Sequence, residues 1–153
     1  MNSPAPDRAT AIELVASTLL GRAARLTRLM MRSGAHEVSR TEAGVLSTLT
    51  GGPRRITELA QTEALAQPTV TQLVDKLEGR GLVARARSGE DGRVVLVEIT
   101  AAGTEELEAL RKEIRANMRE ALAQLPDAEL TELVHASETL GGLIEKLQPG
   151  RAV

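Results

Sequence analysis

The apolar residues of this chain change their spacing within one stretch, residues 39–100. Up to about residue 79 they recur at intervals of three and four, which is the period of a helix with one buried face. Two short β-rich runs follow, Leu82 to Arg87 and Val94 to Thr100, joined by the Gly-containing sequence Ser-Gly-Glu-Asp-Gly-Arg. After Thr100 the helical period returns. The stretch therefore predicts three short helices followed by a β-hairpin.

The three short helices have recognisable start and stop signals. Ser39 and Glu42 have the spacing of a capping box, and Gly51-Gly52-Pro53 ends the helix that follows. We expect a second helix from Ile56 to Glu63. The third begins at Gln67-Pro68, because a proline suits the first helical turn, where its missing N–H has no partner to lose.

Longer helical patterns flank this middle part. We expect one helix from Asp7 to Ser33, a second capped by Thr100, and a third from about Asp127 to Leu147. Their Leu-rich stripes suit a dimer core. The predicted fold is mainly α with a small β-hairpin in a single domain, 1–153. Its parts are a winged helix-turn-helix lobe at 39–100 and a helical dimerisation region at 7–33 and 101–148.

Composition excludes several functions. The chain has no Cys, Trp, Tyr or Phe, so it has no thiol chemistry and no aromatic platform for stacking single-stranded bases. Its two His are too few for a zinc site without carboxylates, and we expect no metal and no cofactor. No apolar run is long enough to span a bilayer and no signal-peptide core follows the start, so we expect an intracellular, cytoplasmic protein.

The net charge of −2 hides an uneven distribution. Residues 100–153 carry six basic and ten acidic side chains, a net of −4. Between residues 76 and 93, in contrast, five basic side chains stand against three acids. A nucleic acid responds to such local charge rather than to the total.

Two short helices with a tight turn between them, the second opened by proline, describe a helix-turn-helix, and the hairpin adds a wing. If Val70, Leu73, Val74 and Leu77 point inward, the opposite face of this helix can enter a DNA groove. Gln72 then suits an adenine edge and the Thr71 methyl a thymine. Thr69, Arg54 and Arg55 suit phosphates, and Arg85 and Arg87 share one face of their strand, which suits a row of phosphates. Arg93 suits a narrow minor groove, with Asp91 holding its guanidinium. Pro68 points outward from the helix, and Lys76 flanks that outer face.

The stretch ITELAQTEALAQPTVTQLVDKLEGRGLVARARSGEDGRVVLVEITAAG resembles the DNA-binding lobe of the multiple-antibiotic-resistance regulator (MarR) family. The resemblance implies a homodimeric transcription factor on a pseudo-palindromic operator. It implies that Thr69, Thr71 and Gln72 meet DNA, that Arg93 is the wing arginine and that Asp91 is its partner. Two positions depart from the family pattern: Gln67 replaces a common Ser, which weakens helix capping, and Gly92 replaces a common basic residue.

The resemblance also implies a repressor released by a small anionic or aromatic effector. Sequence location alone suggests Arg22, Arg25, Met30, Met31 and His36 as lining residues, each of which has a core or solvent role as its simpler explanation. The alternative function is a winged-helix adaptor or antirepressor that contacts only proteins. Catalysis is not expected, since the chain has neither a phosphate-binding Gly loop nor a nucleophile elbow.

Overall fold

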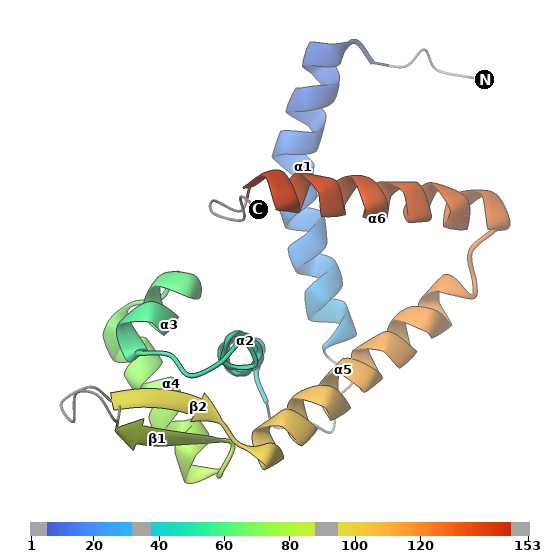
Figure 1. Ribbon diagram of the computed structural model, residues 1–153. Coiled ribbons are helices and arrows are strands. Elements are labelled where there is room, and N and C mark those ends of the chain that lie inside the picture. The colour runs from blue at the N-terminus through green and yellow to red at the C-terminus, as the bar shows by residue number, and fades with distance from the viewer. Residues whose placement is uncertain (1–5, 32–37, 88–94, 148–153) are drawn as a thin grey trace. The chain divides into compact units, whose positions relative to one another are not determined.

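The structure is a computed structural model that describes residues 6–31, 38–87 and 95–147 (Figure 1). Its elements follow the order that the sequence predicts: α1 (Arg8–Met30), α2 (Arg40–Leu49), α3 (Ile56–Thr62), α4 (Gln67–Gly79), β1 (Val83–Arg87), β2 (Val95–Ile99), α5 (Ala101–Leu122) and α6 (Asp127–Leu147). The chain separates into two compact units, Met1–Ile114 and Arg115–Val153.

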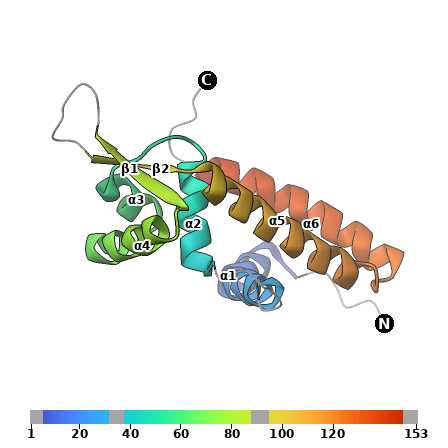
Figure 2. The same cartoon turned by 90° about the horizontal axis from the view of Figure 1, so that it is seen from below.

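The winged lobe lies in the first unit. Strands β1 and β2 pair antiparallel, in a register that runs from Val83 opposite Ile99 to Arg87 opposite Val95. Arg54 forms an isolated antiparallel β-bridge with Val97 of β2, in which their backbone N–H and carbonyl groups exchange hydrogen bonds of 2.9 and 2.8 Å. Both ribbon views show α2, α3, α4 and this hairpin gathered into one lobe (Figure 1 and Figure 2).

The core of the lobe is aliphatic, as a chain without aromatic residues requires. Each short helix contributes the inward residues that its period predicts, with Leu73 of α4 only half-buried. The side chains with almost no exposure are Val45, Leu46, Leu49, Leu59, Val70, Val74, Leu77, Val83 and Val97. Because these residues come from three helices and both strands, the core fixes how the helices meet the wing.

Two junctions between elements have local features that shape the lobe. In the turn between α3 and α4, Ala64 has a φ of +52°, a left-handed conformation that glycine usually occupies. At the start of α5, the Thr100 hydroxyl accepts a hydrogen bond from the Gly103 N–H at 3.0 Å and donates one to the Gly81 carbonyl at 2.7 Å. Thr100 therefore caps α5, as predicted, and also ties it to the end of α4.

The long outer helices contrast with the lobe. Leu107 and Leu110 of α5 are buried, but α1 and α6, which are described over their whole length, bury no residue completely. No helix in the described part of the chain is long and apolar enough to cross a membrane. The apolar stripes predicted for α1 and α6 thus remain largely exposed on a single chain.

Candidate nucleic-acid interface

The outward face of α4 is polar and accessible. Pro68, Thr69 and Gln72 are exposed, while Val70 and Val74 on the opposite side are completely buried. This is the orientation that the sequence predicts for a helix that enters a DNA groove. The buried side fixes the helix to the core, so the outward side chains project from a rigid support.

The beginning of α4 has no side-chain cap. Its N-cap residue is Ala66, whose side chain has no group to accept a hydrogen bond, and Pro68 stands within the first turn. The Val70 N–H bonds to the Ala66 carbonyl at 3.2 Å. Gln67, which the sequence places at the capping position, is instead the first helical residue, so the missing cap belongs to Ala66. Uncapped N–H groups at a helix start favour an anionic ligand such as a phosphate.

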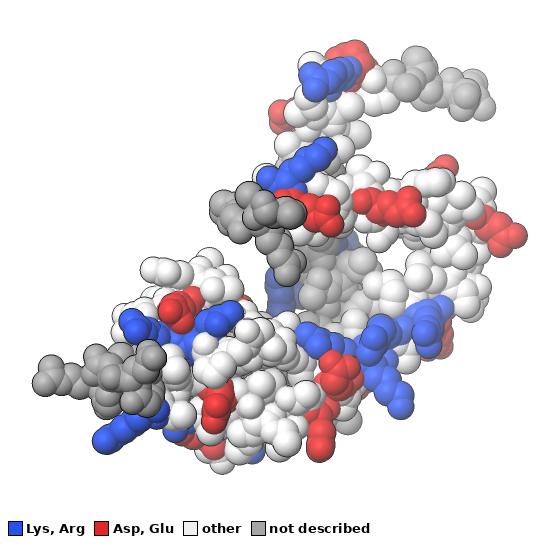
Figure 3. All heavy atoms as spheres, in the orientation of Figure 1, with Lys and Arg blue, Asp and Glu red and all other residues white. Residues whose placement is uncertain are grey.

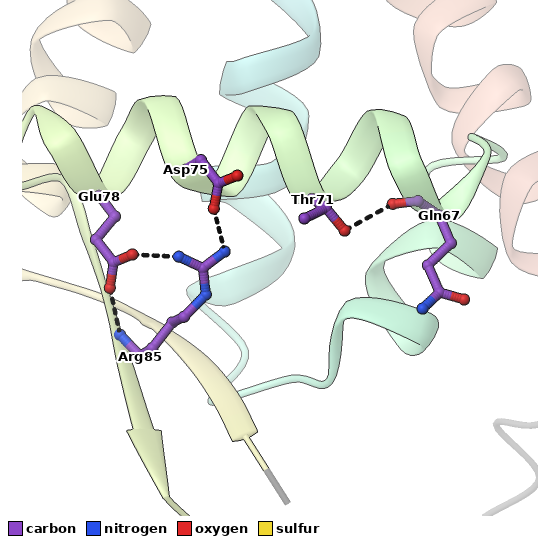
Figure 4. Close-up of polar contacts among 5 residues, drawn as sticks. All are labelled: Gln67, Thr71, Asp75, Glu78 and Arg85. Carbon is purple, nitrogen blue, oxygen red and sulfur yellow. Dashed lines mark hydrogen bonds and ion pairs between the residues drawn. The ribbon is translucent and has the colours of Figure 1, made fainter.

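Thr71 is partly engaged within the helix. Its hydroxyl donates to the Gln67 carbonyl one turn earlier, at 3.0 Å (Figure 4). The hydroxyl hydrogen is therefore already used, which leaves the methyl group and the oxygen lone pairs for other contacts.

Lys76 is exposed, and its ammonium pairs with an acid of the lobe. Its Nζ lies 2.9 Å from Oε1 of Glu42, a residue of α2 whose side chain is completely buried. Arg80 Nη1 lies 3.8 Å from the same oxygen. The other Glu42 oxygen accepts from the Ser39 N–H at 2.6 Å, so the predicted capping box is formed. Glu42 thus connects the start of α2 with α4.

The charge state of Glu42 follows from these contacts. Burial by itself raises the pKa of a carboxyl group, because it disfavours the charged form. The hydrogen bonds from Ser39 and the ammonium of Lys76 outweigh this effect and lower the pKa of Glu42 below its ordinary value. The carboxyl group is therefore ionised at neutral pH.

Arg85 is also bonded within the lobe. Its Nη2 lies 2.5 Å from Oδ1 of Asp75, and its Nη1 binds Oε2 of Glu78, both on α4 (Figure 4). The Arg85 N–H donates to the second Glu78 oxygen at 3.2 Å. Partial burial lowers the pKa of Arg85, but the two carboxylates outweigh it and raise that pKa. The sequence predicts this guanidinium in a row with Arg87 along the phosphates, and in the folded lobe it pairs with two acids of α4.

The remaining predicted residues lie around the hairpin. Arg87 is exposed at the end of β1. Arg54 donates to the Pro53 carbonyl at 3.2 Å, and Arg55 is exposed just before α3. Asp91 and Arg93 lie outside the described residues. Figure 3 shows the basic side chains of this lobe interleaved with acidic ones.

Sequence reasoning missed the partners of Lys76 and Arg85. Lys76 is 34 positions away from Glu42 in the sequence, and Arg85 is 10 positions away from Asp75. The available signal was the acidic pair Asp75 and Glu78, which lies beside the buried stripe of α4 and faces a strand that carries arginines.

Among residues 6–31, 38–87 and 95–147, the structure contains no group of three His, Asp or Glu side chains that could hold a metal ion.

Known proteins resemble this chain in sequence and in structure. A family model described as MarR family matches residues 36–94. An uncharacterized HTH-type transcriptional regulator of Mycobacterium bovis is 32% identical over 124 residues, which cover 80% of this chain and 87% of the relative. A MarR family protein from Bacillus stearothermophilus superposes with a TM-score of 0.71 at 25% identity, over 92% of this chain and 99% of that one. BpsR of Bordetella bronchiseptica, whose DNA binding is regulated by 6-hydroxynicotinic acid, has a TM-score of 0.60 at 22% identity over 82% and 98% of the two chains.

A helix-turn-helix followed by a two-stranded wing defines the winged helix-turn-helix class of DNA-binding proteins. The family model and the Mycobacterium relative narrow that class, and the chain belongs to the MarR family. It is a DNA-binding transcriptional regulator and not an enzyme.

Proposed function

We propose that this regulator is a cytoplasmic repressor that binds a pseudo-palindromic operator as a homodimer and leaves it when a small organic anion binds. The observation that carries the proposal is the face of α4. Gln72 is exposed at its centre, and the residues behind it are completely buried. Such a helix presents polar side chains to base edges from a fixed position, as direct readout requires.

We assign base contacts to Gln72, which pairs with an adenine edge, and to the Thr71 methyl group, which packs on a thymine. Thr69 and Pro68 stand at the uncapped start of α4, where backbone N–H groups favour a phosphate. Arg54, Arg55 and Arg87 supply further phosphate contacts. The family resemblance assigns Arg93 to the minor groove, with Asp91 holding its guanidinium.

Exposed apolar side chains on the outer helices support the homodimer. On α1, Ile12, Val15 and Leu20 are at least half exposed. On α6, in the second unit, the exposed apolar side chains include Leu133, Ile144 and Leu147. Helices with this much uncovered apolar surface favour a protein partner. Two identical chains would give the operator its two-fold symmetry.

A cavity in the first unit supports an anionic effector. It has a volume of about 490 Å³ and is lined by Arg25, Arg28, Leu29, Met31 and Arg40. Three guanidinium groups suit a carboxylate, and the two apolar side chains suit a hydrocarbon ring. Of the residues suggested from sequence, Arg25 and Met31 line this cavity, Arg22 and Met30 are not among its described lining, and His36 lies outside the described residues.

Footprinting of the full chain on the DNA that flanks its gene tests the proposal. We expect two protected half-sites whose centres lie about one helical turn, or roughly 10 base pairs, apart. The addition of benzoate, a ring with a carboxylate, tests whether an organic anion releases the protein from its operator. Neutral benzamide is the matched control. Protection of no flanking DNA would instead favour the adaptor that contacts only proteins.

A further inference from the structure

Ion pairs hold α4 on both of its flanks. On one flank, Lys76 and Arg80 are one turn apart and face Glu42 of α2. On the other, Asp75 and Glu78 are three positions apart and both bind Arg85 of β1 (Figure 4). At 3.6 residues per turn, Gln72 lies between the two flanks. We call these pairings the α2 clamp and the wing clamp.

We propose that the two clamps set the rotation of α4 about its own axis, so that Glu42 and Arg85 are positioning residues for Gln72. In this arrangement Lys76 and Arg85 hold the helix and do not contact phosphates. The inference rests on the proposed function, because the rotation of α4 matters only if this helix reads DNA.

Small rotations of α4 matter because of the helix radius. With side chains included, an α-helix has a radius of about 5–6 Å, so a rotation of about 10° moves an outward group by roughly 1 Å. A hydrogen bond to a base tolerates a distance range of only about 0.5 Å. The apolar core restrains α4 with non-directional contacts. The wing clamp adds directional hydrogen bonds on one side, and the α2 clamp adds an ion pair to a buried carboxylate on the other.

The α2 clamp is strong because its acid is buried. The Glu42 side chain has no exposed surface, and the Lys76 ammonium and the Ser39 N–H each approach one of its oxygens to within 2.9 Å. Loss of one partner from a buried charge costs far more than loss of an exposed pair. Any movement of α4 that takes Lys76 away from Glu42 is therefore penalised.

The wing clamp depends on the shape of arginine. Only a planar guanidinium presents two separate N–H₂ groups, and here Nη1 serves Glu78 while Nη2 serves Asp75. Lysine has a single point charge on a flexible chain and does not reproduce this geometry. A phosphate, in contrast, accepts lysine readily. This difference separates a clamp from a DNA contact.

The experiment compares Arg85→Lys with Arg119→Lys in the full chain. Arg119 is the matched control, since it is an exposed arginine of α5 to which the proposed function gives no DNA contact. We measure affinity for the footprinted operator and for an unrelated duplex of equal length. For Arg85→Lys we expect operator affinity to fall about tenfold with unrelated-DNA affinity unchanged. Arg119→Lys should leave both within about twofold, because its charge is retained.

Glu42→Gln tests the other flank. Glutamine still accepts a hydrogen bond from the Ser39 N–H but gives up the charge that holds Lys76. We again expect about a tenfold loss for the operator alone, with thermal melting measured in parallel. If this variant does not fold, the Arg85→Lys comparison decides the question by itself.

Two failures are distinguishable. If the native protein prefers its operator and Arg85→Lys binds both duplexes as the native protein does, the clamp inference is wrong. If the native protein shows no preference for any duplex, the proposed function itself fails.

Discussion

Gly103 occupies a position where a single methyl group would disrupt the lobe. A Cβ atom there would lie 2.0 Å from the Leu82 carbonyl oxygen and 2.9 Å from Cγ1 of Ile99. The backbone of α5 therefore approaches the start of the wing too closely for any other residue. This contact joins α5 to the residue that leads from α4 into the wing.

We predict that Gly103→Ala lowers the free energy of unfolding by about 2–3 kcal/mol, since overpacking against backbone forces the elements apart. Gly79→Ala is the control, because nothing lies within 4 Å of the methyl group it would add. That variant should be neutral or stabilising by up to about 1 kcal/mol. Urea denaturation of both variants provides the measurement, and equal stabilities would contradict this account of the junction.

Glu42 makes stability depend on pH in a defined direction. Its pKa in the folded protein lies below the ordinary value of 4.5. The stability that its ionised form contributes is therefore fully present above about pH 4.5 and is lost as the pH falls through the lower, folded-state pKa. The stability difference between the native protein and Glu42→Gln should thus narrow between pH 5 and pH 3. Denaturant unfolding at intervals of half a pH unit measures it, and a constant difference over that range would show that the charge has no role.

Replacement of Gln72 tests whether α4 is the helix that reads the bases. We predict that Gln72→Ala relaxes preference at one base pair of each half-site, with a loss of about 1–3 kcal/mol for the preferred base. Gln124→Ala, an exposed glutamine between α5 and α6, is the control. Competition binding with every single-base variant of the operator gives the result. If a uniform loss across all sequences were found instead, Gln72 would be a backbone contact.

Most elements of the lobe could be predicted from sequence because their signals are local. The capping box at Ser39 and Glu42, the first turn at Gln67 and Pro68, and the cap at Thr100 all depend on residues no more than three positions apart. The observed helices α2, α4 and α5 accordingly begin where these signals predict.

The ion pairs could not be predicted in the same way because they are tertiary. From the sequence, Lys76 and Arg85 are basic residues near a groove-binding helix, and a phosphate contact is the simplest expectation. Their actual partners depend on how α2 and β1 pack against α4, which the periodicity of a single segment does not specify. Similarly, Ala64 adopts a left-handed conformation without the glycine that would have signalled it.

At the scale of the whole molecule, the proposed dimer makes α6 an interface. We predict that Leu133→Glu weakens self-association and lowers operator affinity by about a hundredfold, since a monomer engages one half-site alone. Thr131→Glu adds the same charge two residues earlier on the same exposed helix and should preserve the dimer. Sedimentation over a concentration series, paired with operator binding, distinguishes them. A native protein that sediments as a monomer at all concentrations would refute the dimer.

A regulator of this family has to read duplex DNA, and one titration tests that claim for this chain. Affinity for the operator and for a scrambled duplex is measured by fluorescence anisotropy from low to physiological salt. We predict at least a thousandfold preference for the operator and a linear fall of log affinity with log salt, with a slope of about −0.9 for each phosphate contact. Equal affinity for both duplexes, or affinity that does not change with salt, would contradict the claim.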